Sequence, residues 1–322
     1  MTIQSVLNQT YENWELCLVD ASSSNREEIK NKINDYLQRD NRIKCKFLSN
    51  NLGISANTNV ALSMANGEFV HLLDHDDALP PNALFEIIDY MNQDPQCDLI
   101  YSDEDKITMA GVRKDPFFKP DWSPDMLQAG MYIGHSTYRT TLVKELGGFR
   151  PEFDFSQDYD LALRITEKTN RIGHISKVLY HWRELPGSAA TGGKTYARES
   201  NISALSDAMK RRGYNGKAIA LPPCNQYLFE NIEQPLISII IPSDNLENIN
   251  KSISSIVNNS DYPNYEIIIV TNSEICWAFS EKKWDKTIQT VSYDGEYNFS
   301  KKCNIGVENA RGEFVLFLND DV

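Results

Sequence analysis

The motif Asp74-His75-Asp76-Asp77 has residue types and a spacing that suit a cation site. It directly follows the apolar run Phe69–Leu73, which is typical of a β-strand. Carboxylate oxygens at the end of a strand are ligands that hard divalent cations prefer. A cation held there could neutralise a diphosphate, which an acidic chain does not attract by itself. The alternative is a carboxylate-rich turn ahead of Pro80, and the motif alone leaves both interpretations open.

Asp158 is a second candidate for chemistry. It lies within Gln157-Asp-Tyr-Asp-Leu161, at the start of an expected helix. An Asp at this place commonly caps the helix. A carboxylate can instead act as a general base that takes the proton of an attacking hydroxyl. The sequence by itself leaves both roles open.

His181 is a third candidate, within Tyr180-His-Trp-Arg183 after the apolar run Ile175–Leu179. A neutral imidazole at the end of a strand can bind a metal. A lone His is more often structural, so the metal role depends on the presence of Asp76. The sequence assigns no role to the remaining histidines that lie near strands, which are His71, His135 and His174.

An alternation of strands and helices has to position these side chains. Such alternation predicts a largely parallel α/β sheet, in which ligands bind beyond the carboxyl ends of the strands. Asp20 and Asp74 both stand at such ends. The expected strands are residues 14–20, 43–48, 69–74 and 97–101, and the expected helices are residues 25–38, 55–65, 81–93, 140–146, 159–168 and 196–212.

Residues 103–132 interrupt this alternation. The segment interleaves prolines with Phe117, Phe118 and Trp122 and shows no regular period. Because an irregular segment of this length is uncommon inside a compact domain, we expect it to serve the function.

The chain also repeats itself. Gly67-Glu-Phe-Val70 returns as Gly312-Glu-Phe-Val315, and Asp76 returns as Asp321, both at an offset of 245 residues. Similarity at so long a period indicates two copies of one domain. We predict a first domain at residues 1–225, a linker at 226–235 and the N-terminal part of a second domain at 236–322.

The two predicted copies do not begin at the same point. The second opens with the strand-like run Leu236–Ile241, whereas Met1 aligns with Lys251, beyond that run. We therefore expect the first copy to lack its opening strand, and the chain to be a fragment of a longer tandem protein.

An ordered set of motifs resembles family 2 glycosyltransferases of the GT-A fold, in a tandem bacterial form. The resemblance implies an α/β, Rossmann-like nucleotide-sugar-binding domain followed by a truncated second copy. Tyr101-Ser-Asp-Glu-Asp105 and Phe118–Pro124 further resemble transferases that build surface polysaccharides such as O-antigen. The set comprises residues 5–11, 18–20, 51–53, 59, 67–69, 73–77, 147–149, 157–160 and 180–183, and the second copy matches over 236–322.

The resemblance implies a role for each matching side chain. Asp76 and His181 would bind Mn²⁺ or Mg²⁺, and Asp158 would be the catalytic base. Residues that would bind the donor are Asp20 at the nucleotide base, Asp74 at the ribose and diphosphate, Gly147 and Gly148 at the sugar, and Asn51 and Arg183. The partners would be a nucleotide-sugar donor and a glycan or lipid-linked glycan acceptor. A single displacement by the deprotonated acceptor would invert the anomeric carbon, unlike the two-step retaining route.

The second copy departs from this pattern. Thr271 stands where the first copy has Asp20, and Asn319 stands where it has Asp74. Only Asp321 keeps the position expected to bind the metal.

Composition limits the partners and the location. The net charge of −13 gives no general attraction to phosphate backbones, so we expect no nucleic-acid partner. No apolar run is long enough to span a bilayer. The six cysteines are scattered, which favours free thiols in a reducing cytoplasm. The resemblance also allows peripheral association with the inner face of the membrane.

Two other functions compete with glycosyl transfer. A nucleotidyltransferase on a similar fold would lack an Asp placed like Asp158 and would usually carry a Gly-rich basic loop near its start. A non-catalytic sugar-binding module would not need Asp76, Asp158 and His181 together. Hydrolysis of a nucleotide sugar would separate an enzyme from such a module.

Overall fold

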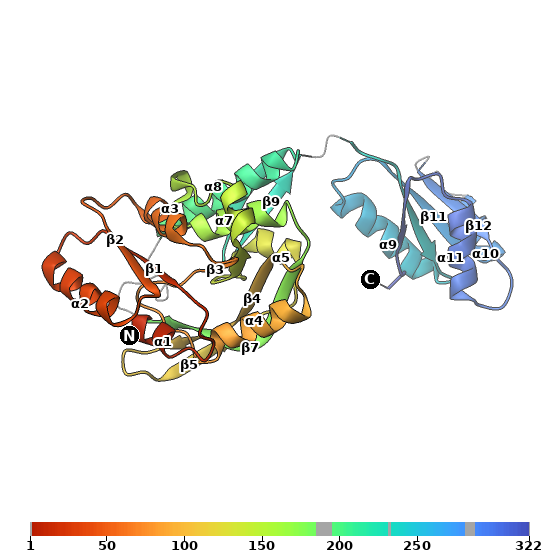
Figure 1. The fold of residues 1–322 in the computed structure, drawn as a ribbon. Helices are drawn as coiled ribbons and strands as arrows, with labels where there is room; N and C mark the ends of the chain where they lie inside the picture. Colours follow the sequence, from red (N-terminus) through yellow and green to blue (C-terminus); the bar gives the residue numbers. More distant parts are fainter. Residues whose placement is uncertain (1, 185–194, 231–232, 281–286, 322) are drawn as a thin grey trace. The chain divides into compact units, whose positions relative to one another are not determined.

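The computed structural model describes residues 2–184, 195–230, 233–280 and 287–321. The chain divides into two compact units, Met1–Glu230 and Asn231–Val322, which are drawn in red to green and in blue in Figure 1. No helix in the described ranges is both long and apolar enough to cross a membrane.

The first half of unit one alternates helices and strands, as expected. In chain order it contains α1 (Thr2–Leu7), β1 (Leu16–Asp20), α2 (Arg26–Arg39), β2 (Ile43–Phe47), α3 (Ile54–Met64), β3 (Phe69–His71), α4 (Ala83–Gln93), β4 (Leu99–Ile107) and β5 (Arg113–Phe117).

The second half of unit one is richer in helix and ends in a hairpin. It contains α5 (Pro124–Ala129), β6 (Thr137–Arg139), α6 (Thr140–Glu145), the 3-10 helix η1 (Pro151–Phe153), α7 (Gln157–Thr166), β7 (Ile172–Arg183), α8 (Thr195–Arg211), β8 (Gly216–Leu221) and β9 (Cys224–Phe229). The hairpin of β8 and β9 extends four residues into the segment predicted as linker. Pro222 and Pro223 lie at its turn.

The sheet of unit one is mixed and lies in two parts. Among the described residues, β1 pairs with β2 alone, in parallel. In the larger sheet β4 is central, because it pairs in parallel with β7 and antiparallel with β5 and β6. β3 pairs with β6 on the outer side. Parallel pairing therefore holds for β1–β2 and β4–β7, whereas β6 runs against both of its neighbours.

Unit two contains one parallel sheet in the order β12-β11-β10-β13. The sequence repeat relates β11 to β1 and β13 to β3, and β10 lies between β11 and β13. The elements are β10 (Ile237–Pro242), α9 (Leu246–Asn259), β11 (Tyr265–Thr271), α10 (Ser273–Ser280), β12 (Ile288–Ser292), α11 (Phe299–Glu308) and β13 (Phe314–Phe317).

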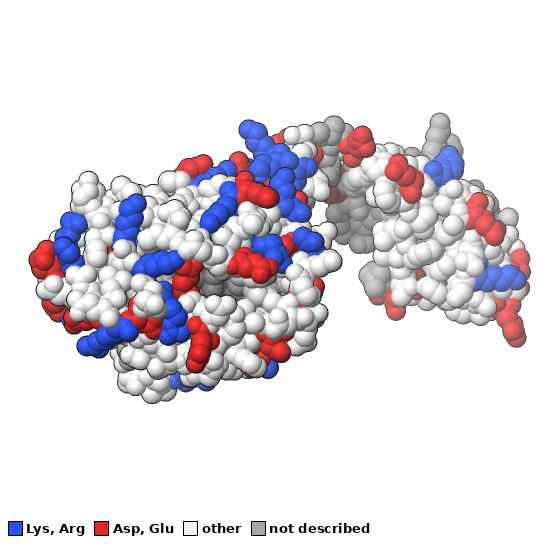
Figure 2. Space-filling model, in the orientation of Figure 1, with Lys and Arg blue, Asp and Glu red and all other residues white. Residues whose placement is uncertain are grey.

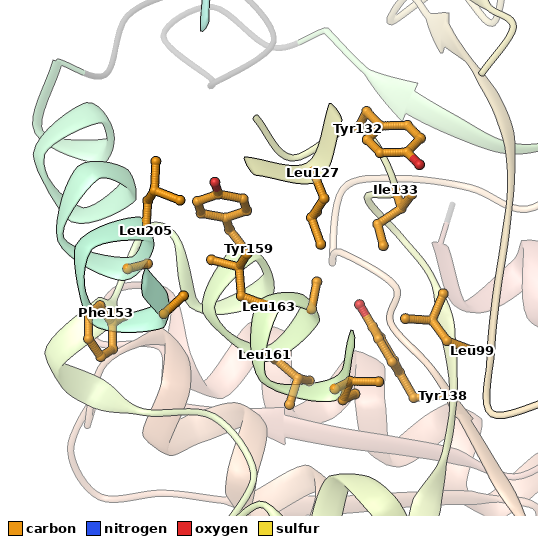
Figure 3. Close-up of a cluster of buried hydrophobic side chains, with 14 of the residues drawn as sticks. Leu99, Leu127, Tyr132, Ile133, Tyr138, Phe153, Tyr159, Leu161, Leu163 and Leu205 are labelled. Atoms are coloured by element: carbon orange, nitrogen blue, oxygen red, sulfur yellow. The ribbon is translucent and has the colours of Figure 1, made fainter. Parts of the chain in front are cut away.

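The core of unit one lies on both faces of β4. Leu99 and Tyr101 belong to one buried cluster and Ile100 to another, as the alternation of side chains along a strand requires. The first cluster, part of which is shown in Figure 3, is filled from α7 and α8 by residues such as Leu163 and Leu205. The second is covered by α4 through Ala83 and its neighbours. Burial on both faces fixes β4 and with it the acidic residues at its end.

The surface carries mixed charge. On the face shown in Figure 2, Lys and Arg side chains are interspersed with Asp and Glu side chains and do not gather into one basic stripe.

Candidate active site

The loop of Asp74–Asp77 lies between β3 and α4, against the end of β7. Asp77 is fully buried, and its carboxylate accepts hydrogen bonds from the Tyr180 hydroxyl and the Arg183 amide, both at 2.7 Å. Ala78 and His181 exchange backbone hydrogen bonds of 2.9 and 3.2 Å. Burial raises the pKa of Asp77 to about 6, although these two hydrogen bonds act in the opposite direction. Asp77 therefore fastens the loop to β7.

Helix α1 supports the other side of this loop. The Thr2 hydroxyl donates to the carbonyl oxygens of His75 at 2.8 Å and Asp77 at 2.7 Å. Gln9 donates to the Pro80 carbonyl at 2.8 Å and accepts from the Leu84 amide at 2.9 Å. These contacts give the Ser5–Tyr11 motif a structural role in holding the acidic loop.

A buried group of opposite charges lies beside the loop. The Lys119 ammonium, 1% exposed, donates to Glu104 at 2.9 Å, and His135 Nδ1 lies 3.2 Å from the same carboxylate oxygen. Burial opposes ionisation of Glu104, but its hydrogen bond to His135 and the charge of Lys119 outweigh burial and lower the pKa of Glu104 to about 2. Burial disfavours charged His135 too, yet the hydrogen bond and charge of Glu104 raise the pKa of His135 above its ordinary value.

His135 joins this group to the acidic loop. Its ring stacks on Tyr180 at 3.7 Å between centroids and 9° between planes. Tyr180 in turn accepts from the Asp74 amide at 3.1 Å. One potential ligand atom from each of Asp74, Asp77 and His135 lies within 4.8 Å of the others, a spacing that suits shared binding of one cation.

His135 also has an unusual backbone. Its φ of 57° lies in the left-handed region, which non-glycine residues rarely adopt. Such strain costs about 1–3 kcal/mol and persists only where surrounding contacts hold it. The stacking on Tyr180 and the hydrogen bond to Glu104 are contacts of this kind.

Asp158 faces the same region from α7. The helix begins at Gln157 with Ser156 as its N-cap, so Asp158 is its second residue and does not cap it. Burial raises the pKa of Asp158, and Asp74 adds to this effect while His135 and backbone amides oppose it. Asp158 is thus within electrostatic reach of both Asp74 and His135. The side chain is partly exposed. A partly exposed carboxylate with a raised pKa is suited to accept a proton.

Asp160, by contrast, is committed to the core. It is fully buried and binds Arg164 at 2.7 Å and Arg150 through a short ion pair. Arg164 donates in turn to the carbonyl oxygens of Leu146 at 2.9 Å and Gly148 at 2.7 Å. This network ties α7, and therefore Asp158, to the turn after α6.

The predicted donor glycines form that turn. Gly147 and Gly148 have φ angles of 78° and 71°, which favour glycine. A Cβ on Gly148 would lie 2.4 Å from Asn59 Oδ1, whereas one on Gly147 would meet nothing within 4 Å. Asn59 needs this approach because it bonds the Phe149 amide at 2.8 Å and the Phe149 carbonyl at 2.7 Å. Packing against Asn59 therefore explains why position 148 is a glycine. At Gly147 the space that a Cβ would occupy is open.

The other predicted site residues have local partners. Asp20 ends β1 and accepts from the Ser22 amide at 3.0 Å. Asn51 accepts from the Gly53 amide at 3.0 Å and orders that turn. Arg183 is buried and donates from Nε to the Asp76 carbonyl at 2.6 Å. These contacts are compatible with donor binding and do not require it.

The two predicted metal ligands come from adjoining segments. Asp76 is held through its carbonyl by Arg183, and its side chain is 25% exposed. His181 is nearly buried, and its Nδ1 lies 2.5 Å from Asp105 of β4. Their segments meet through the bridge of Ala78 and His181, and joint metal binding stays a prediction.

Sequence reasoning missed His135, Glu104 and Lys119. The signal was present, because Glu104 and Lys119 fall in the two motifs that resemble O-antigen transferases. Their pairing depends on the irregular segment returning to β4, which Asp103 secures through the Lys119 amide at 2.9 Å. His135 has no motif of its own in the sequence.

Comparison with known proteins identifies the family of the chain. The family model described as glycosyl transferase family 2 matches residues 1–146 and 238–322. The uncharacterized protein y4gI of Sinorhizobium fredii is 38% identical over 99% of this chain, and the O-antigen biosynthesis protein RfbC of Myxococcus xanthus is 32% identical over 99%. The chain spans 37% and 26% of the lengths of these two relatives.

The fold has solved counterparts. Staphylococcus aureus TarS 1–349, in complex with UDP-GlcNAc, superimposes with a TM-score of 0.52 at 19% identity, covering 65% of this chain and 61% of that one. At this identity the likeness concerns the fold, which is the GT-A type expected. With the family model matching most of the sequence in two segments, the chain belongs to glycosyl transferase family 2.

Proposed function

We propose that residues 1–225 form the catalytic domain of an inverting glycosyltransferase that moves a sugar from a nucleotide-sugar donor to a growing surface glycan. The observation that carries this proposal is the position of Asp158. It is partly buried, burial raises its pKa, and it lies within electrostatic reach of the Asp74 loop. A proton acceptor beside a potential cation site is what single displacement needs.

The reaction follows from these residues. Asp158 takes the proton of an acceptor hydroxyl, and the oxygen attacks the anomeric carbon from the face opposite the leaving nucleoside diphosphate. The bond from the anomeric carbon to the diphosphate breaks as the new glycosidic bond forms, so the configuration inverts. Asp20 and Asn51 would contact the nucleoside, and Arg183 would hold the loop that carries Asp74.

The residues present fit a divalent cation. Ligand atoms of Asp74, Asp77 and His135 lie within 4.8 Å of one another. His181 pairs through its backbone with Ala78, directly after the same loop. Oxygen ligands suit Mg²⁺ and Mn²⁺. When bound, the cation would neutralise charge on the departing diphosphate. We propose Asp76 and His181 as its ligands, in keeping with the family resemblance.

The described function of one relative supports a glycan as the acceptor. RfbC of Myxococcus xanthus is described as an O-antigen biosynthesis protein. We propose a glycan or lipid-linked glycan acceptor by similarity to it, and association with the membrane surface would follow from a lipid-linked acceptor.

A panel of nucleotide sugars with Mn²⁺ tests this proposal. Release of a nucleoside diphosphate from one donor, dependent on Asp158, is expected. For a transferred sugar, the proton coupling of the product's anomeric centre by NMR should show inversion relative to the donor. Donor binding without any turnover, in the presence of surface-glycan acceptors, would instead favour a sugar-binding module. Retention of configuration would contradict the single displacement.

A further inference from the structure

The structure assigns a further ligand and its support to the proposed cation site. We propose that His135 supplies an imidazole nitrogen to the cation, and that Glu104, itself held by Lys119, is the positioning residue that orients the His135 ring. This inference rests on the proposed glycosyl transfer, because it concerns the cation of that reaction.

The first support is the environment of the two His135 nitrogens. Nδ1 lies 3.2 Å from Glu104, so an Nδ1–H can donate to that carboxylate. The other nitrogen, Nε2, is then left with its lone pair. A ligand atom of His135 lies within 4.8 Å of Asp74 and Asp77 ligand atoms, so the imidazole has carboxylate partners with which to share a cation. We infer that Nε2 is the ligand, because it is the nitrogen that keeps a lone pair. A carboxylate behind a metal-binding His is a common means of fixing its tautomer and orientation.

The second support is that Glu104 is itself fixed. Lys119 donates to Glu104 at 2.9 Å and to the Gly134 carbonyl, next to His135, at 3.3 Å. The Lys119 amide is bound to Asp103 at 2.9 Å, so both the backbone and the side chain of Lys119 are anchored to β4. Because the buried ammonium of Lys119 is held by these partners, its hydrogen bond fixes the position of the Glu104 carboxylate.

The third support is the ring and the backbone of His135. Stacking on Tyr180 sets the ring plane, and the φ of 57° turns the residue toward the loop although its backbone is strained. Tyr180 also bonds Asp77, so the same ring fixes both an imidazole and a carboxylate. Strain held by contacts on several sides is typical of functional positions.

A second carboxylate–imidazole pair beside β4 provides the control. Asp103 is buried and lies 3.0 Å from His174 Nε2, and His174 is bound on its other side by Asp121 at 3.1 Å. H174N removes the imidazole of this pair, while Asp103 still accepts from the Lys119 amide and the pair of Glu104 and His135 stays in place.

The test measures Mn²⁺ affinity of the 322-residue chain by electron paramagnetic resonance, with donor-free protein and thermal melts in parallel. We expect E104Q to weaken Mn²⁺ binding by about 10–100-fold, the usual effect of losing a support of this kind, with H174N close to wild type. E104D should recover part of the affinity. Long-range proton–nitrogen spectra with Mg²⁺ should show His135 protonated at Nδ1 in wild type.

Other results would overturn the inference. Unchanged Mn²⁺ affinity in a folded E104Q would do so, as would equal losses in E104Q and H174N. Should E104Q fail to melt cooperatively, H135N decides, because Asn tolerates the left-handed backbone. Wild-type affinity in H135N would remove His135 from the site. If wild type itself binds no Mn²⁺, the inference falls too. Diphosphate release that needs Asp158 but no cation would then leave the proposed transfer standing.

Discussion

Gly148 should tolerate an added methyl group much less well than its neighbour Gly147. Both glycines have left-handed φ angles, 71° and 78°, so either alanine pays a backbone strain of about 1–2 kcal/mol. Alanine also reduces the entropy of the unfolded chain, which offsets about 0.4–1 kcal/mol of that strain. We therefore expect G147A to destabilise unit one by about 1 kcal/mol.

A second destabilising contribution, a steric clash of the added Cβ, applies to Gly148 and not to Gly147. Its Cβ would lie 2.4 Å from Asn59 Oδ1, so Asn59 has to move. Asn59 would then lose its two hydrogen bonds to Phe149, each contributing about 0.5–1.5 kcal/mol. The expected cost of G148A is about 2–4 kcal/mol.

Thermal melts of the two variants provide the assay. For a unit of this size, 1 kcal/mol corresponds to about 2–4 °C in Tm, so G148A should melt clearly below G147A. Equal shifts would refute the argument that Asn59 sets the requirement at Gly148. Because Gly147 has open space above its Cα, a rise in donor KM for G147A would separately support its predicted place in the donor pocket.

Three further predictions follow from the same geometry. Turnover should fall as the pH decreases through the pKa of Asp158, because only its carboxylate accepts the proton. Burial raises this pKa, so the acidic limb of the kcat/KM profile should lie above the pH range of an ordinary Asp. An acidic limb within the ordinary range would contradict this prediction. D160N should lower the unfolding free energy by about 3–5 kcal/mol in a denaturant titration, because it leaves buried Arg164 without its charge partner, and a loss below about 1 kcal/mol would contradict this. Joining a copy of residues 236–250 ahead of residue 2 should raise the Tm of unit one. Within the described ranges β1 and β3 each pair on one side only, so an added strand could pair with the free edge of both. An unchanged Tm would count against a strand between them.

The helices and strands of unit one were largely predictable from the sequence where apolar residues recur with a regular period. The helix expected at residues 25–38 is α2 at Arg26–Arg39, and the one expected at 196–212 is α8 at Thr195–Arg211. Long amphipathic or buried segments carry their period in the sequence itself. The position of Asp74 after a strand was predictable for the same reason.

The short antiparallel strands were not predictable in this way. β6 has three residues, Thr137–Arg139, and reads as part of the connection to the next helix. β5 is exposed along its whole length, so it has no alternation of apolar residues. Both are held by pairing with β4 or β3, which is information that a local pattern does not contain.

The residues of the candidate site also fall into two groups, those that a local sequence pattern predicts and those that it does not. The acidic loop and Tyr180–Arg183 could be expected to meet, since the sequence places both at strand ends. Tyr180–Arg183 form the last residues of β7, and the bridge of Ala78 and His181 agrees with that expectation. Glu104 and Lys119 could not, because buried charges are rare and isolated ones in a sequence are more often solvated. Their pairing needs the irregular segment to return to β4, where Asp103 accepts from the Lys119 amide, and no local pattern indicates that return.

A comparison of wild type with D158N tests the central claim most directly. The measurement is donor affinity by calorimetry together with turnover by release of the nucleoside diphosphate, on the same donor. If Asp158 is the base of an inverting glycosyl transfer, D158N should bind the donor almost as wild type does, while turnover falls by about 10²–10⁴-fold. Loss of donor affinity with unchanged turnover would show that Asp158 is a binding residue and would contradict the account.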